Sequence, residues 1–159
     1  MSETSPTLHD LLTGGVPPGV YRLPSRASLR AVQQAAGQHG WRVHRIMGRR
    51  IADKPDFLAE SARSLHFPKY FGHNWDAFEE SLNDLVYETS ERTLVLFDHV
   101  GRFAAAEPEE FATALDILRS AVEARRTSDA PLVVLLQGAA RAADATVLRM
   151  EEERRKKED

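Results

Sequence analysis

Two short apolar runs stand out in the pattern of hydrophobic and polar residues along the chain. Residues 93–97 and 132–136 are almost wholly apolar, which is typical of parallel strands that are covered on both faces. Residues 41–46 mix apolar and polar side chains, as in a strand toward the edge of a sheet, and residues 19–23 suit a further short strand. The pattern predicts a small parallel β-sheet of three to four strands.

Between these runs, apolar residues recur at the three- and four-residue spacing of amphipathic helices. We expect Ser25 to cap a helix that runs to Ala36, and Asn74 to cap the helix in the middle of the chain. Pro55 and Pro108 suit the first turns of two further helices. Strands that alternate with helices predict an α/β fold, in which α-helices pack on the sheet through right-handed crossovers.

The chain has 159 residues, a length that one domain accommodates. Glycines and prolines among positions 14–18 interrupt any helix that begins near Leu8, so we predict a flexible N-terminal arm over residues 1–17. Residues 18–138 are predicted to form a single α/β domain. The end of the chain is dense in both bases and acids, and we predict a charged, partly helical tail over residues 139–159.

The composition excludes several classes of function. The absence of cysteine rules out a disulfide framework, a zinc–thiolate site and a cysteine nucleophile. No apolar run approaches the roughly 20 residues of a membrane span, and no signal-peptide pattern opens the sequence, so we expect a cytoplasmic protein that does not bind membranes. The phosphate-loop, dinucleotide, hydrolase and zinc-protease motifs are absent as well.

The six histidines do not suggest a metal or catalytic site. No two of them are three or four residues apart, so no helix presents a pair to a metal ion. His73 lies beside Asn74 and near Asp76, but a histidine in a turn is more often a solvated polar residue than an acid–base catalyst. We therefore predict that the chain is not an enzyme and that it holds no metal and no other cofactor.

Charge is distributed unevenly along the chain, although the formal net charge is only -3. Between Tyr21 and Lys54 there are eight Lys or Arg residues and a single acid, Asp53. Between Phe71 and Glu91 the sign reverses, with six acids and no Lys or Arg. Such asymmetry is typical of a surface that meets a charged partner.

A short aromatic loop leads into the acidic part of the chain. Tyr70 and Phe71 lie between Pro68 and Gly72, which punctuate the loop. Large aromatic side chains placed in this way offer rigid contact area at a small cost in conformational entropy. The loop is therefore a candidate for contact with a partner.

Acidic residues recur every four positions in the helix that follows. Asp76, Glu80 and Asp84 are spaced in this way, and Glu79 lies beside them. Like charges four residues apart destabilise a helix by roughly 0.2–0.5 kcal/mol per pair, and only Asp76 lies in the first turn, where the helix dipole stabilises an acid. Two interpretations stay open: a docking site for a cationic protein, and an acidic face that is merely solvated.

The stretch from Pro68 to Ala77, with the sequence Pro-Lys-Tyr-Phe-Gly-His-Asn-Trp-Asp-Ala, resembles the corresponding motif of the barstar family. Members of that family are intracellular bacterial proteins that inhibit secreted ribonucleases of the barnase type. A weaker resemblance extends from about Ile46 to Leu136. The resemblance implies a barstar-like fold. It also implies that the loop and the acidic helix plug the nuclease active site, with acids in the places of RNA phosphates.

The resemblance and the charge pattern together indicate a set of partner-binding residues. Glu80 takes the central role, because it replaces the family aspartate that reaches the phosphate-binding site and pairs with several donors. A later family glutamate falls at Ser120, with Glu123 one turn on as its alternative. The predicted partner-binding residues are Tyr70, Phe71, Gly72, Asn74, Asp76, Glu79, Glu80, Asn83 and Asp84.

The predicted partner is a barnase-like ribonuclease or another cationic nuclease, and we expect no direct contact with nucleic acid. A barstar-like adaptor or toxin-neutralising module that binds some other cationic protein is the first alternative. The second is nucleic-acid binding through the basic stretch, which lacks the aromatic platform that single strands need. The arginines of that stretch are Arg42, Arg45, Arg49 and Arg50.

Overall fold

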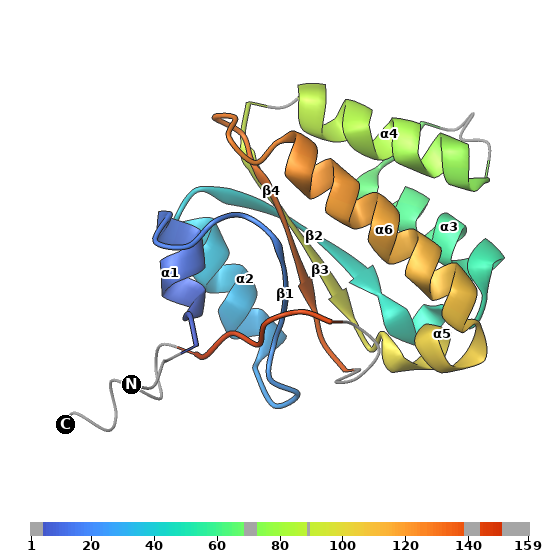
Figure 1. Ribbon diagram of the computed structural model, residues 1–159, viewed down its shortest axis with the longest axis horizontal. Helices are drawn as coiled ribbons and strands as arrows, with labels where there is room; N and C mark the ends of the chain where they lie inside the picture. Colours follow the sequence, from blue (N-terminus) through green and yellow to red (C-terminus); the bar gives the residue numbers. More distant parts are fainter. Residues whose placement is uncertain (1–4, 69–72, 89, 139–143, 151–159) are drawn as a thin grey trace.

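The fold is described from a computed structural model of the chain (Figure 1). The described residues are 5–68, 73–88, 90–138 and 144–150. They form a four-stranded parallel sheet with helices on both faces, which confirms the predicted α/β class. The strands are β1 (Val20–Arg22), β2 (Trp41–Met47), β3 (Arg92–Asp98) and β4 (Leu132–Leu136). Their order across the sheet is β1-β4-β3-β2.

The apolar pattern of each strand follows from its place in the sheet. The central strands β3 and β4 are buried along almost their whole length. Strand β2 lies at one edge, where Arg42 is exposed and Arg45 half-buried, and this position explains its mixed sequence. Because consecutive side chains of a strand point to opposite faces, Leu96 and Phe97 pack into different cores.

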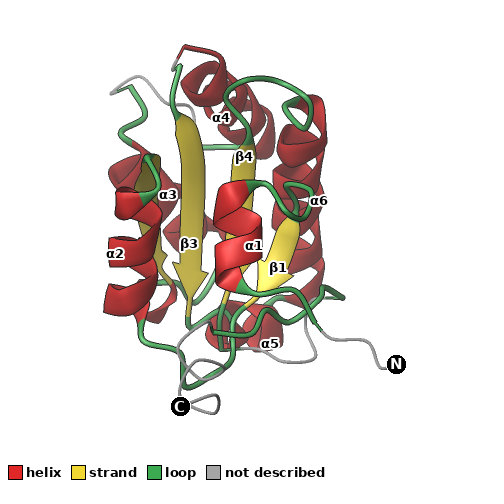
Figure 2. Ribbon diagram, turned by 90° about the vertical axis from the view of Figure 1, so that its left-hand side faces the viewer, coloured by secondary structure: helices red, strands yellow, loops and turns green. Residues whose placement is uncertain are grey.

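The helices lie in two layers, one on each face of the sheet (Figures 1 and 2). Asn74 caps the middle helix, since its Oδ1 accepts a hydrogen bond from the backbone N–H of Ala77 at 2.7 Å, and Pro55 and Pro108 lie in first turns as predicted. The helices are α1 (Leu8–Thr13), α2 (Leu29–Gln38), α3 (Lys54–Leu65), α4 (Trp75–Glu88), α5 (Gly101–Ala106) and α6 (Pro108–Ala124), with a short 3-10 helix η1 (Gly48–Arg50). Helices α1 and α2 cover one face, and α3 to α6 cover the other (Figure 1).

Two helices differ from the sequence pattern. Helix α2 is capped by Ser28 instead of Ser25, and the Ser28 Oγ accepts the backbone N–H of Ala31 at 3.1 Å. The residues before it form a turn, because the side-chain Nε2 of Gln137 donates hydrogen bonds to two of their carbonyl oxygens. The apolar pattern gives no signal for α5, in which only Phe103 is buried.

The described part of the segment that the sequence predicted as a flexible arm, residues 5–17, includes a helix that packs on the sheet. Helix α1 opens with a capping box between Thr7 and Asp10. Leu8, Leu11 and Leu12 are buried in the same core as the inner side chains of α2. The glycines and prolines that follow end the helix. Helix α1 nevertheless lies against one face of the sheet (Figure 2), because its leucines are part of the core on that face.

The described part of the predicted tail, residues 144–150, is also held against the fold. Val147 forms a parallel bridge with Arg22 of β1, and Leu148 is fully buried. This stretch contains no helix, because its backbone N–H and C=O groups bond to β1 and to the segment before α1. The rest of the tail lies outside the described residues, and the division into arm, domain and tail stays a prediction.

Candidate partner-binding site

Helix α4 has one apolar face and one acidic face. Phe78 and Leu82 are fully buried, and Trp75 and Leu85 pack half-buried beside them. Phe78 meets Phe57 of α3 edge to face, with ring centroids 5.2 Å apart. This stripe fixes which side of α4 faces the core and leaves the opposite side to solvent.

All the predicted binding residues within α4 lie on its exposed side. They are Asp76, Glu79, Glu80, Asn83 and Asp84. Within the described part of the chain, none of the four carboxylates forms an ion pair or accepts a hydrogen bond from a side chain. The structure therefore brings four unneutralised carboxylates together on little more than two helical turns.

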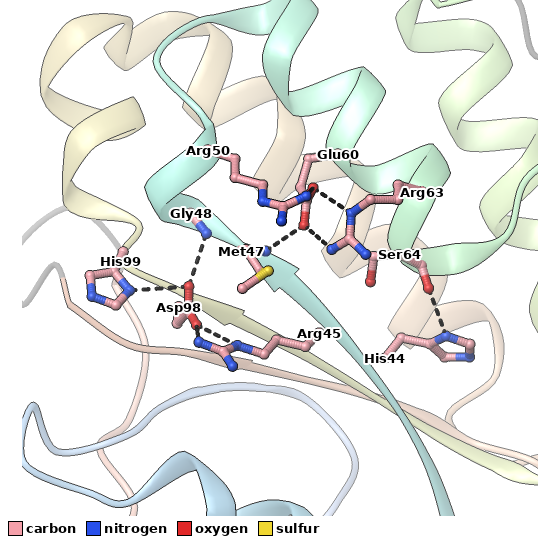
Figure 3. Close-up of polar contacts among 10 residues, drawn as sticks. All are labelled: His44, Arg45, Met47, Gly48, Arg50, Glu60, Arg63, Ser64, Asp98 and His99. Atoms are coloured by element: carbon pink, nitrogen blue, oxygen red, sulfur yellow. Dashed lines mark hydrogen bonds and ion pairs between the residues drawn. The ribbon is translucent and has the colours of Figure 1, made fainter.

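A different kind of carboxylate lies at the end of β3 (Figure 3). Asp98 is fully buried, and its oxygens accept hydrogen bonds from Gly48 N at 2.9 Å and Arg45 Nε at 2.7 Å, with His99 Nδ1 at 3.2 Å. Burial alone raises the pKa of Asp98, but the hydrogen bonds from Gly48, His99 and Arg45 outweigh burial and hold the pKa below its usual value. Asp98 thus ties β2, β3 and η1 together.

Glu60 of α3 is a second buried carboxylate with several partners (Figure 3). It accepts the backbone N–H of Met47 at 2.8 Å and the Nε–H of Arg63 at 2.8 Å, and Arg50 lies 3.7 Å away. Burial raises the pKa of Glu60, while hydrogen bonds from Arg63 and Met47 lower it and prevail. Glu60 anchors α3 to the end of β2.

His44 of β2 is buried beneath the end of α3 (Figure 3). Its Nδ1 donates a hydrogen bond to the carbonyl oxygen of Ser64 at 3.1 Å, whereas its buried Nε2 has no partner among the described residues. Burial lowers the pKa of His44, and the nearby charges of His66 and Arg42 lower it further against the raising effect of the Ser64 carbonyl. The structure therefore favours the neutral imidazole.

Three of the four arginines that suggested nucleic-acid binding have acidic partners within the same chain. Arg42 contacts Glu91 at 2.8 Å, and Arg45 contacts the buried Asp98. Arg50 faces the buried Glu60 at 3.7 Å. Because these arginines already have acidic neighbours, the stretch offers fewer uncompensated charges to phosphates than the sequence suggested.

The remaining predicted site residues are less fully placed. Tyr70, Phe71 and Gly72 lie outside the described residues, so their roles stay predictions. Asn74 is exposed, and its Oδ1 caps α4. On α6, Ser120 and Glu123 are both exposed, and the Glu123 carboxylate lies 3.3 Å from Arg126.

One polar contact of the site has no counterpart in the sequence pattern. The indole Nε1–H of Trp75 donates a hydrogen bond to Glu110 Oε1 on α6 at 3.0 Å. The two residues are 35 positions apart. No local pattern links them, because the contact exists only when α4 and α6 lie side by side (Figure 1).

Membrane-spanning helices and metal sites are two features that the sequence disfavoured. No helix among the described residues is long and apolar enough to cross a membrane. No group of three or more histidine, cysteine, aspartate or glutamate side chains in the same residues is placed to hold a metal ion.

The described residues thus form an α/β domain with four exposed carboxylates on one helix, and none of these has an ion pair among the described residues. The family model described as "Barstar (barnase inhibitor)" matches residues 41–137, more than half of the chain. The chain belongs to the barstar family, as the motif around Asn74 predicted. No curated protein sequence matches the chain at a significant level.

Solved structures with a similar fold extend beyond this family. The ORC2 protein of Aeropyrum pernix matches in its ADPNP–ADP complexes with a TM-score of 0.54 and 18% identity, covering 86% of this chain and 39% of that chain. Its ADP form matches with a TM-score of 0.57 and 14% identity, covering 90% and 44%. The chain thus spans less than half of the ORC2 chains, and at these identities the similarity shows the fold alone.

Proposed function

We propose that the chain inhibits a basic ribonuclease by covering its active site with the exposed face of α4 and the aromatic loop before it. The observation that carries the proposal is the row of four exposed carboxylates without an ion pair among the described residues, in a member of the barstar (barnase inhibitor) family. The helix dipole stabilises Asp76 in the first turn, but the acids beyond that turn gain little from it, and like charges four residues apart repel. A cationic active site supplies the opposite charges.

The geometry of α4 suits a cationic surface that normally binds phosphates. Carboxylates four residues apart lie about 6 Å apart along a helix axis, so Asp76, Glu80 and Asp84 meet cationic side chains at successive points. Each contact is a charge-assisted hydrogen bond to Lys or Arg. Glu80 lies in the middle of the row, where hot spots of protein interfaces concentrate, and is therefore the central contact of the proposal.

The loop before α4 contributes the apolar part of the proposed contact. Tyr70 and Phe71 supply aromatic surface, and Gly72 lets the loop approach the partner closely. Asn74, which caps α4 through the backbone N–H of Ala77, is a further contact of the proposal. The charged row steers the encounter, and the central contacts slow dissociation.

The proposal makes the protein a cytoplasmic binder that protects its own cell from a nuclease destined for secretion. It acts by binding and needs no catalytic group, metal or cofactor of its own. If the partner were some other cationic protein, the same row would bind it without inhibiting RNA hydrolysis. The two cases therefore separate in a single assay.

The experiment is a titration of the purified protein into a barnase-like ribonuclease that is hydrolysing RNA, at low and at physiological salt. We expect inhibition to be complete at one inhibitor per enzyme, with an association rate that falls as salt rises. The absence of inhibition across several such nucleases would overturn the proposal. Binding to a cationic protein without inhibition would then point to the adaptor.

A further inference from the structure

One side chain joins the start of α4 to two other helices. Trp75, the first residue of α4, donates its indole Nε1–H to Glu110 Oε1 of α6 at 3.0 Å. Lys54 Nζ, at the start of α3, lies over the same ring, 5.4 Å from its centroid. The tryptophan therefore holds α3 and α6 to α4 at the point where the chain enters the candidate site, directly before Asp76.

The apolar packing and the polar contact of Trp75 are separable. The ring packs against Phe57 and Phe78, with centroids 5.7 and 6.0 Å away, and both neighbours are fully buried. Phenylalanine at position 75 keeps most of this packing but has no N–H to donate. Trp75→Phe therefore removes the hydrogen bond with little loss of apolar contact.

Rotation of α4 about its own axis decides where its carboxylates point. Side chains extend about 5–6 Å from a helix axis, so a roll of about 10° moves a carboxylate by about 1 Å. Apolar burial of Phe78 and Leu82 is non-directional and tolerates such a roll. A hydrogen bond to a carboxylate is directional and short, and it does not tolerate it.

We propose that Trp75 and Glu110 are positioning residues, which fix the rotation of α4 so that the acidic row meets its partner in one geometry. The cation of Lys54 over the indole ring supports the same orientation. Trp75 lies on the side of α4 that faces the core, so the proposal assigns it a positioning role and no direct contact with the partner. The inference rests on the proposed function.

The test measures association and dissociation rates with the ribonuclease for Trp75→Phe, Glu110→Gln and the double variant. We expect Trp75→Phe to raise the dissociation rate about tenfold, as for the loss of a hydrogen bond to a charged group, with little change in the association rate because the charged row is intact. The double variant is expected to match Trp75→Phe. Additive effects of the two changes would contradict a shared contact.

Glu109→Gln is the matched control for Glu110→Gln. Glu109 is the neighbouring residue on α6 and is exposed, and the substitution removes the same charge. In contrast to Glu110, its carboxylate has no side-chain partner among the described residues. We expect the Glu109→Gln variant to dissociate from the ribonuclease at the rate of the unmodified protein. An equal rise in Glu109→Gln and Glu110→Gln would assign the effect to charge and overturn the positioning role.

Leu148→Ala is the control for a general loss of stability. It opens a cavity in the core beneath α1 and α2 and does not change any residue that contacts α4. We expect this variant to unfold more easily in urea and to keep its dissociation rate. Amide hydrogen exchange of residues 76–80 in the free protein adds a readout that needs no nuclease. We expect this exchange to quicken in Trp75→Phe, Glu110→Gln and the double variant, and to stay unchanged in Glu109→Gln and Leu148→Ala.

The outcomes distinguish the two proposals. If the unmodified protein inhibits but neither the dissociation rate nor the exchange changes in Trp75→Phe, the positioning role is wrong and the inhibitor function stands. If the unmodified protein binds no nuclease but the exchange quickens as expected, the inhibitor function fails and the anchoring of α4 stands. Unchanged exchange in that case overturns both.

Discussion

Two sets of carboxylates in this protein have opposite environments. Asp98 and Glu60 are buried, each accepts several hydrogen bonds, and their pKa values lie below the usual range because those bonds outweigh burial. Asp76, Glu79, Glu80 and Asp84 of α4 are exposed and have no ion pair among the described residues. The first set joins elements of the fold through hydrogen bonds, whereas the second set remains available to a partner.

The contrast shows why a count of acids says little about function. Asp98 is in direct contact with Arg45 and Gly48 and holds the carboxyl end of the sheet together. Glu80 contributes the same formal charge, yet it carries repulsion from Asp76 and Asp84. Mutations in the two sets should therefore affect stability and binding in opposite ways.

The largest expected effect is that of Asp98→Ala. It leaves the Gly48 N–H without its acceptor and Arg45 without its buried partner, so we expect the free energy of unfolding to fall by about 3 kcal/mol. Urea denaturation followed by circular dichroism measures the change. A loss below about 1 kcal/mol would mean that Asp98 is not the structural carboxylate described here.

A second large effect is expected for Gly48→Ala, next to Asp98. A Cβ at position 48 would lie 1.9 Å from the carbonyl oxygen of Asp98, so η1 or the end of β3 must shift. We expect a loss of about 1–3 kcal/mol in the free energy of unfolding, measured in the same way. Gly37→Ala is the matched control, because a Cβ there meets no atom within 4 Å. Equal losses in the two variants would contradict the close approach of η1 to β3.

The next effect concerns pH and the buried groups. The lowered pKa of His44 means that the unfolded chain takes up a proton before the folded protein does. Stability is therefore expected to fall as pH drops below the unfolded value of about 6.5, by at most about 1.4 kcal/mol per pH unit. Asp98 and Glu60 extend the loss below about pH 4, since their stabilisation disappears as they protonate.

The measurement is the free energy of unfolding between pH 7 and 5 in the unmodified protein and in His44→Leu. We expect the slope to disappear in the variant, whatever its stability at pH 7. A slope of the same size in both proteins would show that another group causes it.

The smallest effect is expected for Glu80→Gln. The change removes two like-charge contacts four residues apart, so we expect the free energy of unfolding to rise by about 0.4–1 kcal/mol. The same urea experiment detects it. A fall in stability would mean that Glu80 has a structural partner, and the contrast with Asp98 would no longer hold.

Much of the fold follows from local sequence pattern, because burial imposes a period on each element. The apolar runs of β3 and β4 and the stripe of α4 through Phe78 and Leu82 are of this kind. The packing of α1 escaped prediction, because the glycines and prolines that follow Leu12 resemble a loop and the sheet face that receives its leucines is formed by residues far along the chain.

In the candidate site, too, some features follow from local sequence and others depend on tertiary structure. The exposure of Glu80 and Asp84 follows from helical spacing, whereas the bond between Trp75 and Glu110 depends on tertiary structure and leaves no local signal. Nor does the sequence separate a buried, paired carboxylate such as Glu60 from a solvated one, because both occur in charged helices.

The most direct test of the account compares Glu80→Gln with Glu88→Gln in the ribonuclease inhibition assay. Both changes remove one negative charge from α4, but Glu80 is in the middle of the exposed row and Glu88 is the last residue of the helix. We expect Glu80→Gln to weaken inhibition at least tenfold more than Glu88→Gln, since hot spots lie centrally. Small and equal effects would contradict the claim that the exposed row of α4 is the binding site.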